Sequence, residues 1–355
     1  MVDYIIVGSG LAGIAFAEMA LQNGKTVLVI NNQSQNSSKV AAGLYNPVIL
    51  KRFTEVWQAK EQINLLHEFY SKLETKLNVI LDYKIPLLRK FHSIEEQNNW
   101  FTASDKPILS DFLAPNLITK KYDAIASPLG FGKVLYSGFV DTALLLESYK
   151  SYLLSINSYL EETFEYDFLI HNNDSIQYKN QTAKQIVFAE GYGMLLNPFF
   201  SSLPLDGAKG ELLLIKAPNL NLDVVVKTGI FIIPLGNDIY KVGATYNWED
   251  KTITPTQSAK EELITDLKEL IQCDFEIIDH LAGIRPTVKD RRPMLGSHPI
   301  HKNIYLLNGL GTRGVMLAPA MAKMLYEYIE NKTTLNSYVD INRFKNFASS
   351  FYRNE

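Results

Sequence analysis

One short pattern near the N-terminus constrains the fold of this chain more than any other. The apolar run Tyr4-Ile5-Ile6-Val7 leads directly into the glycine-rich segment 8–13, and residues 14–21 then have the composition of a helix. After Gly24, which we expect at the C-terminal cap of that helix, residues 25–30 form a second apolar run. A strand, a Gly-x-Gly-x-x-Gly turn, a helix and a second strand within about 30 residues are the setting in which these glycines bind a dinucleotide. The sequence therefore predicts a parallel α/β sheet with a dinucleotide site at its first turn.

Each glycine of this turn has its own physical reason. Gly8 permits the tight turn, Gly10 lets the backbone approach a pyrophosphate, and Gly13 lets the helix lie close to the sheet. The helix N-terminus supplies N–H groups and the positive end of a dipole to the phosphates, so Leu11 and Ala12 are also predicted to bind the cofactor.

The acidic residue that usually ends the second strand of such a unit is absent. Asn31 stands 23 positions after Gly8, and Asn32 follows it. An amide can hydrogen-bond a ribose hydroxyl, but without the charge assistance of a carboxylate. We include Asn31 and Asn32 as candidate cofactor residues, and the sequence leaves open whether the missing carboxylate weakens binding.

The next segment, residues 37–44, is a loop of small side chains. Small residues let the backbone approach a flat ring system closely, which suits an isoalloxazine, and a flexible surface loop is the alternative interpretation. The candidate cofactor residues in this loop are Ser38, Ala41, Ala42, Gly43 and Leu44.

A second strand, glycine loop and helix occur near the C-terminus. Residues 303–307 form an apolar strand, residues 308–314 read Asn-Gly-Leu-Gly-Thr-Arg-Gly, and residues 315–322 are again helical in composition. The dipole of this second helix is available to a ring carbonyl that gains negative charge on reduction.

Composition limits what else the chain can be. It has 355 residues, a formal net charge of −3 and one cysteine. The length predicts two domains, the single cysteine excludes an internal disulfide, and the charge argues against a general polyanion binder. Since the first residues carry no positive charge and the apolar stretches are too short to span a bilayer, we expect a cytoplasmic protein without membrane insertion.

Taken together, these motifs resemble the FAD-dependent D-amino acid oxidase superfamily, in the layout of glycine oxidase and monomeric sarcosine oxidase. The resemblance covers essentially the whole chain, and the order and spacing of its motifs match the family. The segments that carry it are 8–13, 37–44, 137–141, 184–191, 209–211, 242–245 and 282–320.

This resemblance implies a role for several residues. It implies that Arg285 clamps a substrate carboxylate over the flavin, with a structural salt bridge as the alternative. It implies that Phe231 and Tyr246 are pocket walls, with core aromatics as the alternative, and that Arg313 also contacts substrate. The residues that it places against the flavin are Gly191, Gly309, Gly311, Thr312, Arg313, Gly314 and Val315.

The implied activity is FAD-dependent oxidative deamination or N-dealkylation of a small amine that carries a carboxylate, of the glycine, N-methylglycine or D-amino acid type. Hydride would pass to flavin N5, and oxygen or a quinone would reoxidise the flavin. Because Cys273 lies outside the positions of covalent attachment in the family, non-covalent FAD is expected. No catalytic acid–base pair is assigned.

Two alternatives stay open. Residues 243–246, 290–294 and 309–314 also resemble the FAD domain of the bifunctional tRNA wobble-uridine modification enzyme, which removes a carboxymethyl group from an amine oxidatively. The net charge of −3 shows no obvious tRNA footprint, which disfavours this reading. The second alternative is a flavoprotein that retains FAD without turnover.

The fold class implied is α/β, or α+β overall: a Rossmann-like FAD-binding domain interleaved with a mainly antiparallel-sheet substrate domain. We expect the FAD domain at 1–85, 138–202 and 281–355, and the substrate domain at 86–137 and 203–280. The apolar spacing of residues 55–77 predicts an amphipathic helix. His298 and His301 have no third ligand nearby in sequence, so no metal site is expected.

Overall fold

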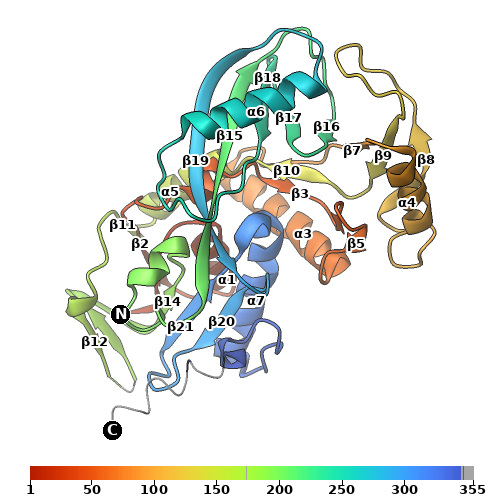
Figure 1. The fold of residues 1–355 in the computed structure, drawn as a ribbon. Coiled ribbons are helices and arrows are strands. Elements are labelled where there is room, and N and C mark those ends of the chain that lie inside the picture. The colour runs from red at the N-terminus through yellow and green to blue at the C-terminus, as the bar shows by residue number, and fades with distance from the viewer. Residues whose placement is uncertain (173, 345–346, 348–355) are drawn as a thin grey trace.

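Two large sheets organise the molecule, which we describe from a computed structural model covering residues 1–172, 174–344 and 347. Figure 1 shows the first sheet in the lower half of the view and the second above it, with the long strands β15 and β19 running between the two regions. The fold expected from the sequence, a parallel-sheet domain combined with a mainly antiparallel one, is confirmed.

The first sheet has a parallel centre, in the spatial order β11, β2, β1, β14 and β21. The glycine turn follows its central strand β1, whose last four residues are completely buried. Burial on both faces explains why these strands are continuous apolar runs without alternation. The parallel strands are β1 (Val2–Val7), β2 (Val27–Ile30), β11 (Tyr159–Leu160), β14 (Gln181–Phe188) and β21 (Ile304–Asn308). Three antiparallel strands complete the sheet: β12 (Leu169–His171), β13 (Ile176–Tyr178) and β20 (Met294–Ser297).

Helices cover one face of this sheet and bury its alternate side chains. Tyr4 and Ile6 of β1 face a core that these helices share, whereas Ile5 and Val7 face a second core on the opposite side. Side chains alternate along a strand, so one strand serves both cores. The helices of the first core are α1 (Leu11–Gln22), α3 (Ala59–Leu77), α5 (Thr142–Ser155) and α7 (Gly314–Asn331).

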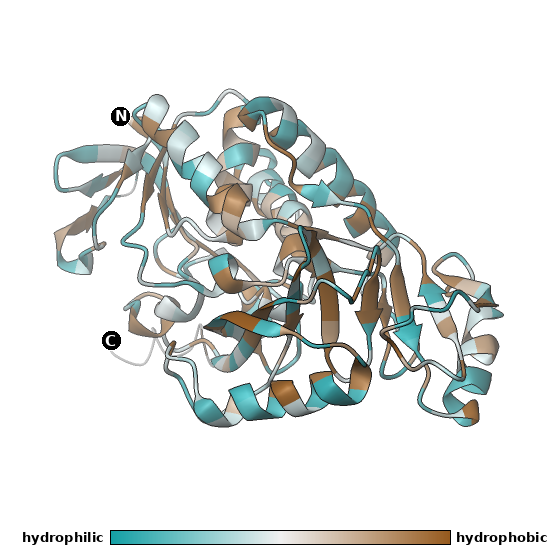
Figure 2. Ribbon diagram, turned by 90° about the horizontal axis from the view of Figure 1, so that it is seen from above, coloured by the Kyte–Doolittle hydropathy of each residue, from teal (hydrophilic) through white to brown (hydrophobic). Residues whose placement is uncertain are grey.

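The second sheet is antiparallel except where β16 pairs with β7. Helix α6 (Gln257–Leu270) packs on one face, where Leu263 and Leu267 are completely buried. Figure 2 shows the strands in the middle of the molecule as mostly brown and the outer side of α6 with long teal stretches. In spatial order the strands are β19 (Glu276–Val288), β15 (Leu205–Lys216), β18 (Ile239–Gly243), β17 (Phe231–Gly236), β16 (Val225–Lys227), β7 (Leu87–Lys90), β9 (Phe131–Val134) and β8 (Leu113–Ile118).

Smaller elements connect the two sheets. One small sheet has the order β3 (Leu44–Tyr45), β10 (Gly138–Val140) and β6 (Asp82–Tyr83), and β4 (Val48–Ile49) pairs with β5 (Thr54–Glu55). The remaining helices are α2 (Ser37–Val40), α4 (Ile94–Ser104), η1 (Tyr166–Phe168), η2 (Gly191–Leu196), η3 (Gly311–Arg313) and η4 (Ile341–Arg343). The second sheet takes its strands from residues 87–134 and 205–288, and the exact domain boundaries stay a prediction.

Three local expectations need correction. The helix predicted over 55–77 begins at Ala59, because Thr54 and Glu55 pair with β4 and Gln58 is left-handed, with φ of 50°. The predicted loop 37–44 contains one helical turn, α2. Helix α1 ends at the cap residue Asn23, and Gly24 follows it with φ of 73°.

The search for membrane-spanning segments found none: within the described residues, every helix is too short or too polar to cross a bilayer.

Candidate functional site

A cavity of about 1860 Å³ lies where the carboxyl ends of the parallel strands meet the open face of the second sheet. The ends of β1, β2, β14 and β21 contribute Gly8, Asn31, Gly191 and Asn308 to its lining, and the second sheet contributes Phe231. Ligands of open α/β sheets bind at this edge, because the strand ends there leave a crevice beneath helix N-termini. The cavity is about twice the volume of an ordinary small-molecule pocket, so it has room for more than one ligand.

The first glycine turn is held in place by side chains that also line the cavity. Ser38 Oγ accepts a hydrogen bond of 3.2 Å from the Leu11 amide, and Asn31 Oδ1 accepts one of 3.3 Å from the Ser9 amide. The other end of the Asn31 amide donates to the Tyr159 hydroxyl at 3.2 Å. Both polar atoms of Asn31 therefore have protein partners, which fix the turn.

Two of the predicted cofactor residues do not line the cavity. Gly13 is packed against the turn, and a β-carbon there would collide with the carbonyl oxygen of Gly8. Gly309 has φ of 74°, and a β-carbon there would lie 2.7 Å from Val288 Cγ2. Both glycines permit close packing beneath the cavity, the role that the sequence analysis predicted for Gly13.

The other predicted residues are brought together at the cavity wall. Arg285, Phe231, Tyr246 and Arg313 line it on the side of the second sheet and of α7. The predicted cofactor residues that line it are Gly8, Gly10, Leu11, Ala12, Asn31, Asn32, Ser38, Ala41, Ala42, Gly43, Leu44, Gly191, Gly311, Thr312, Arg313, Gly314 and Val315.

Helices α1 and α7 both begin at this cavity. Leu11 and Ala12 open α1, Gly314 and Val315 open α7, and all four line the cavity. A β-carbon on Gly314 would press on Leu11 Cδ1 at 2.9 Å, so the two helix starts are in close contact. First-turn amides have no acceptor within their own helix, so two helix N-termini offer N–H donors and positive dipole ends to anionic or partly negative ligand atoms.

Arg285 extends from β19 across the neighbouring strand β15. Its guanidinium lies against the backbone of Gly210, where a β-carbon would collide with all three terminal guanidinium atoms. Nη1 donates to the Thr245 carbonyl at 3.2 Å, and Cζ lies 4.4 Å from the centre of the Tyr246 ring. Burial lowers the pKa of Arg285, although an arginine stays charged at any ordinary pH.

Arg313 approaches the same part of the cavity from the start of α7. Its Nη1 donates to the Asn46 carbonyl at 3.4 Å, and burial lowers its pKa. Among the residues that the structure describes, neither Arg285 nor Arg313 forms an ion pair with a carboxylate. Two partly buried guanidinium groups are thus left to face an anion from outside the protein.

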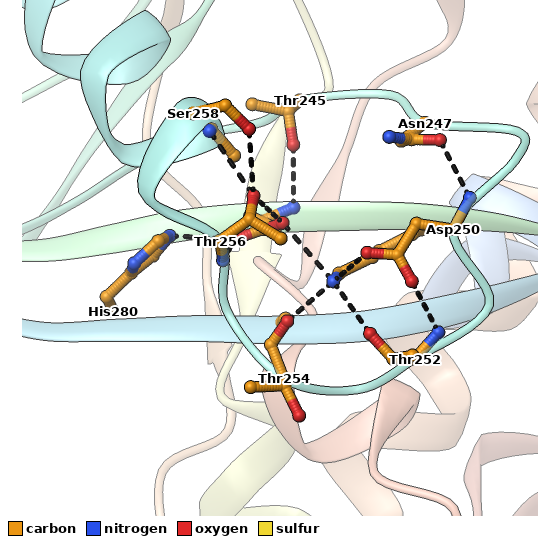
Figure 3. Close-up of polar contacts among 12 residues, drawn as sticks. Thr245, Asn247, Asp250, Thr252, Thr254, Thr256, Ser258 and His280 are labelled. Carbon is orange, nitrogen blue, oxygen red and sulfur yellow. Dashed lines mark hydrogen bonds and ion pairs between the residues drawn. The ribbon is translucent and has the colours of Figure 1, made fainter.

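The loop that carries Tyr246, residues 244–256, is anchored by a buried lysine, on which Asp250 and Thr254 of the loop converge (both labelled in Figure 3). Lys209 is completely buried, and its Nζ lies 2.6 Å from Asp250 Oδ2 and donates to the Thr254 carbonyl at 2.5 Å. The ion pair holds the pKa of Asp250 down at about 2. A carboxylate and a carbonyl from one loop therefore converge on a single cation.

Glu211 holds the two ends of this loop from the same strand. Its carboxylate accepts hydrogen bonds from both the amide and the hydroxyl of Thr256, at 2.8 and 2.9 Å. Its backbone amide donates to Thr245 Oγ1 at 3.0 Å, and His280 Nε2 lies 2.9 Å from its Oε2 (Figure 3). The Lys-Gly-Glu segment 209–211 thus anchors the loop on both sides of the glycine that accommodates Arg285.

Two residues that line the cavity were not predicted from the sequence. Glu190, at the end of β14, accepts hydrogen bonds from the Tyr166 hydroxyl and Asn197 Nδ2, and burial raises its pKa to about 7. Lys227, at the end of β16, lines the cavity beside Phe231. Glu190 lies in segment 184–191, which carries the family resemblance. A charged residue directly before Gly191, a predicted cofactor residue, could therefore have identified it from the sequence. Lys227 has no local motif.

A third imidazole lies beside His298 and His301 in space. His171 comes from the distant strand β12, and its ring centre lies 3.9 Å from that of His301. Burial lowers the pKa of His298 to about 4. Within the described residues there is still no group of side chains arranged to hold a metal ion.

Comparison with known proteins points to one family. A family model described as FAD dependent oxidoreductase, DAO, matches residues 3–328. Glycine oxidase of Pseudomonas aeruginosa is 24% identical over 351 residues, which cover 92% of this chain and 94% of that protein. The crystal structure of glycine oxidase from Geobacillus kaustophilus superposes with a TM-score of 0.77 at 20% identity, covering 95% of this chain and 96% of the other.

A second relative is a longer protein, to which this chain is similar over most of its own length. The tRNA 5-methylaminomethyl-2-thiouridine biosynthesis bifunctional protein MnmC of Marinobacter nauticus is 22% identical over 92% of this chain. This chain spans 55% of that protein's length.

Proposed function

The chain belongs to the DAO family of FAD-dependent oxidoreductases, and we propose that it oxidises a small amine that carries a carboxylate, of the glycine, N-methylglycine or D-amino acid type. The observation that carries this proposal is the pair Arg285 and Arg313. Both line the cavity between the start of α7 and the loop with Tyr246, and neither has a carboxylate partner among the described residues. A guanidinium matches a carboxylate as a planar, two-pronged donor.

The residues around the first glycine turn fit the family's cofactor. The turn before α1 is bare of side chains at Gly8 and Gly10, so this turn and the Ala12 amide would hold the pyrophosphate, beside the Leu11 amide that already donates to Ser38. The N-terminus of α7 would face a ring carbonyl of the flavin. Gly43 and Gly191, which also line the cavity, leave room for the rest of the cofactor. When bound, FAD supplies the acceptor for two electrons from the C–H bond next to the substrate nitrogen.

We propose that the FAD is held without a covalent bond. Cys273, the one cysteine of the chain, packs against the core between α6 and the second sheet and is not among the cavity-lining residues.

Orientation is the protein's main contribution to the reaction. Arg285, fixed by Gly210 and the Thr245 carbonyl, holds the substrate carboxylate, and Tyr246 covers the guanidinium from the solvent side. Phe231 contributes an apolar wall, which excludes water from the reacting C–H and amine. The substrate would lose a hydride from carbon to the flavin and a proton from nitrogen to solvent. Water then hydrolyses the resulting imine to an oxo acid and either ammonia or, for an N-substituted substrate, an amine.

The test is anaerobic flavin reduction by a panel of glycine, N-methylglycine and D-alanine. Arg285→Ala should weaken the apparent affinity for all carboxylated amines, and Arg285→Lys should recover only part of it, because a lysine cannot bind a carboxylate with two parallel hydrogen bonds. Unchanged affinity in both variants would exclude the clamp. A protein whose FAD no amine reduces would favour the alternative of a non-catalytic flavoprotein.

The second candidate function is oxidative removal of a carboxymethyl group from a modified tRNA uridine. The similarity to MnmC across most of the chain supports it, since a carboxymethylated amine also has a C–H between a nitrogen and a carboxylate. Reduction of the flavin by tRNA carrying this modification, but not by free amino acids, would favour this function.

A further inference from the structure

The cavity continues beyond the proposed substrate site along one face of the second sheet. Gly243, Phe231, Lys227 and Arg89 stand directly opposite one another on β18, β17, β16 and β7. Directly paired residues project from the same face of a sheet. Phe231, Lys227 and Arg89 all line the cavity, so its wall changes from aromatic to cationic within two strands.

Lys227 has no counter-ion in this wall. Its Nζ donates to the Gly229 carbonyl at 2.8 Å and lies 5.8 Å from the centre of the Phe231 ring. No carboxylate forms an ion pair with it among the residues described by the structure. Burial, and then the charge of Arg89, lower the pKa of Lys227 to about 8, which is the direction expected for a cation without an anionic partner.

Arg89 differs from Lys227 because its charge is already matched. Its Nε and Nη2 donate to Glu96 Oε1 at 2.8 and 2.6 Å, and Nη1 donates to the Thr228 carbonyl at 2.6 Å. Three of its five N–H donors are therefore used within the protein, and Glu96 matches its charge. Of the two cations in this row, Lys227 is the one that can take an anion from a ligand.

We propose that Lys227 forms a second anion subsite, which selects substrates that carry a carboxylate or phosphate-type group at the end distal to the carboxylate held by Arg285. This inference rests on the proposed function, and it narrows the substrate class from a simple carboxylated amine to an N-substituted one with an anionic substituent. The amine then lies between two anions, one at Arg285 and one at Lys227.

The spacing across the sheet sets the length of the substituent. Lys227 lies one strand beyond Phe231, a step of about 4.8 Å. A two-carbon linker followed by a charge-assisted hydrogen bond of about 2.8 Å spans such a step. The cavity lining also includes Lys51, Arg52 and Lys106, together with the acids Glu95 and Glu96. Glu96 is already paired with Arg89. Within the described part of the chain, unpaired cations therefore outnumber unpaired acids among these residues, and their field favours an anionic substituent.

A matched pair of substrates tests the subsite on the FAD-loaded enzyme. N-(2-carboxyethyl)glycine and N-propylglycine have the same number of chain atoms, and the first carries a carboxylate where the second carries a methyl group. We expect kcat/KM for flavin reduction to be at least about tenfold higher for the anionic member, because a charge-assisted hydrogen bond is gained. Lys227→Met should abolish this preference by lowering kcat/KM for N-(2-carboxyethyl)glycine, and Lys227→Arg should retain it.

A control variant and a measurement without turnover complete the test. Lys90 follows Arg89 on β7 and does not line the cavity. Lys90→Met therefore removes a nearby lysine and should leave the preference intact. Titration of the flavin absorbance with adipate and with hexanoate, which match the two substrates in chain length, should give tighter binding of the dicarboxylate, and this difference should vanish in Lys227→Met.

Each outcome bears on one statement only. If the enzyme reduces its flavin with both substrates equally and Lys227→Met changes neither rate, the subsite is excluded while the proposed function stands. If neither substrate nor glycine reduces the flavin, the proposed function fails. Replacing the distal carboxylate by a phosphonate, in N-(2-phosphonoethyl)glycine, shows which of the two anions the subsite prefers. A rate of flavin reduction higher than that of the carboxylate substrate assigns the subsite to a phosphate-type group. A lower rate assigns it to a carboxylate.

Discussion

The guanidinium of Arg285 lies against the bare Cα of Gly210, on the strand next to its own. No side chain larger than hydrogen fits between them, since a β-carbon on Gly210 would overlap the terminal nitrogens and the carbon of the guanidinium. The position of the proposed carboxylate clamp therefore depends on the absence of a side chain at Gly210.

Gly210→Ala should displace Arg285 without unfolding the protein, because the obstructed atoms are the far end of a flexible side chain. We expect the apparent affinity for carboxylated amines to fall by about 10- to 100-fold, the equivalent of one strong charge-assisted hydrogen bond of roughly 1.5–3 kcal/mol. The FAD content and melting temperature should change little. Gly229→Ala is the matched control: Gly229 also lines the cavity, but a β-carbon there has nothing within 4 Å. Equal effects of the two substitutions would contradict the role of Gly210.

Tyr70 should stabilise the start of α7. Pro319 has no N–H to give to the Val315 carbonyl one helical turn earlier, and the buried Tyr70 hydroxyl donates to that carbonyl at 3.1 Å instead. Tyr70→Phe leaves the carbonyl unsatisfied and should lower the free energy of unfolding by about 1–3 kcal/mol in urea titrations. Tyr83→Phe, which removes an exposed hydroxyl, is the control. In a Pro319→Ala background the cost of Tyr70→Phe should shrink, and an undiminished cost would refute this account.

Glu190 should make the stability of the protein depend on pH. Burial raises its pKa from 4.5 to about 7, so the folded state binds a proton that the unfolded state has released between these two values. The stability that Glu190 contributes is therefore greatest below about pH 4.5 and falls as the pH rises to about 7. The apparent melting temperature of Glu190→Gln, relative to the native protein, should rise as the pH increases from about 5 to about 8. Parallel melting curves across this range would show that Glu190 does not titrate there.

The buried Lys209 should contribute far more stability than Lys251, a half-buried lysine in the same loop. Lys209→Met leaves Asp250 and Glu211 without their cation, and breaking such a buried pair costs about 3–5 kcal/mol. Lys251, whose partner Asp206 is largely exposed, is the comparison, and Lys251→Met should cost about 1 kcal/mol or less. Urea unfolding of the two variants measures the difference. Similar costs would mean that the loop is held by its backbone contacts alone.

Local sequence was sufficient for the parts of this protein whose physics is local. The unit from Tyr4 to Ile30 could be read directly, because a buried strand, a glycine turn and a helix are each encoded by neighbouring residues. Errors arose where pairing across the chain overrode the local pattern, as at Thr54 and Glu55, whose pairing with β4 delays the start of α3 to Ala59.

Which residues share the cavity was decided by the tertiary structure. Arg285 could be named from the family resemblance, but its fit against Gly210 depends on the pairing of β19 with β15 across 75 residues of chain. The row formed by Phe231, Lys227 and Arg89 depends on the register of three strands, one of which lies far away in sequence. A lysine at the end of a short strand has no distinguishing local pattern. Only the folded sheet shows that Lys227 lines the cavity and that, among the described residues, no carboxylate forms an ion pair with it.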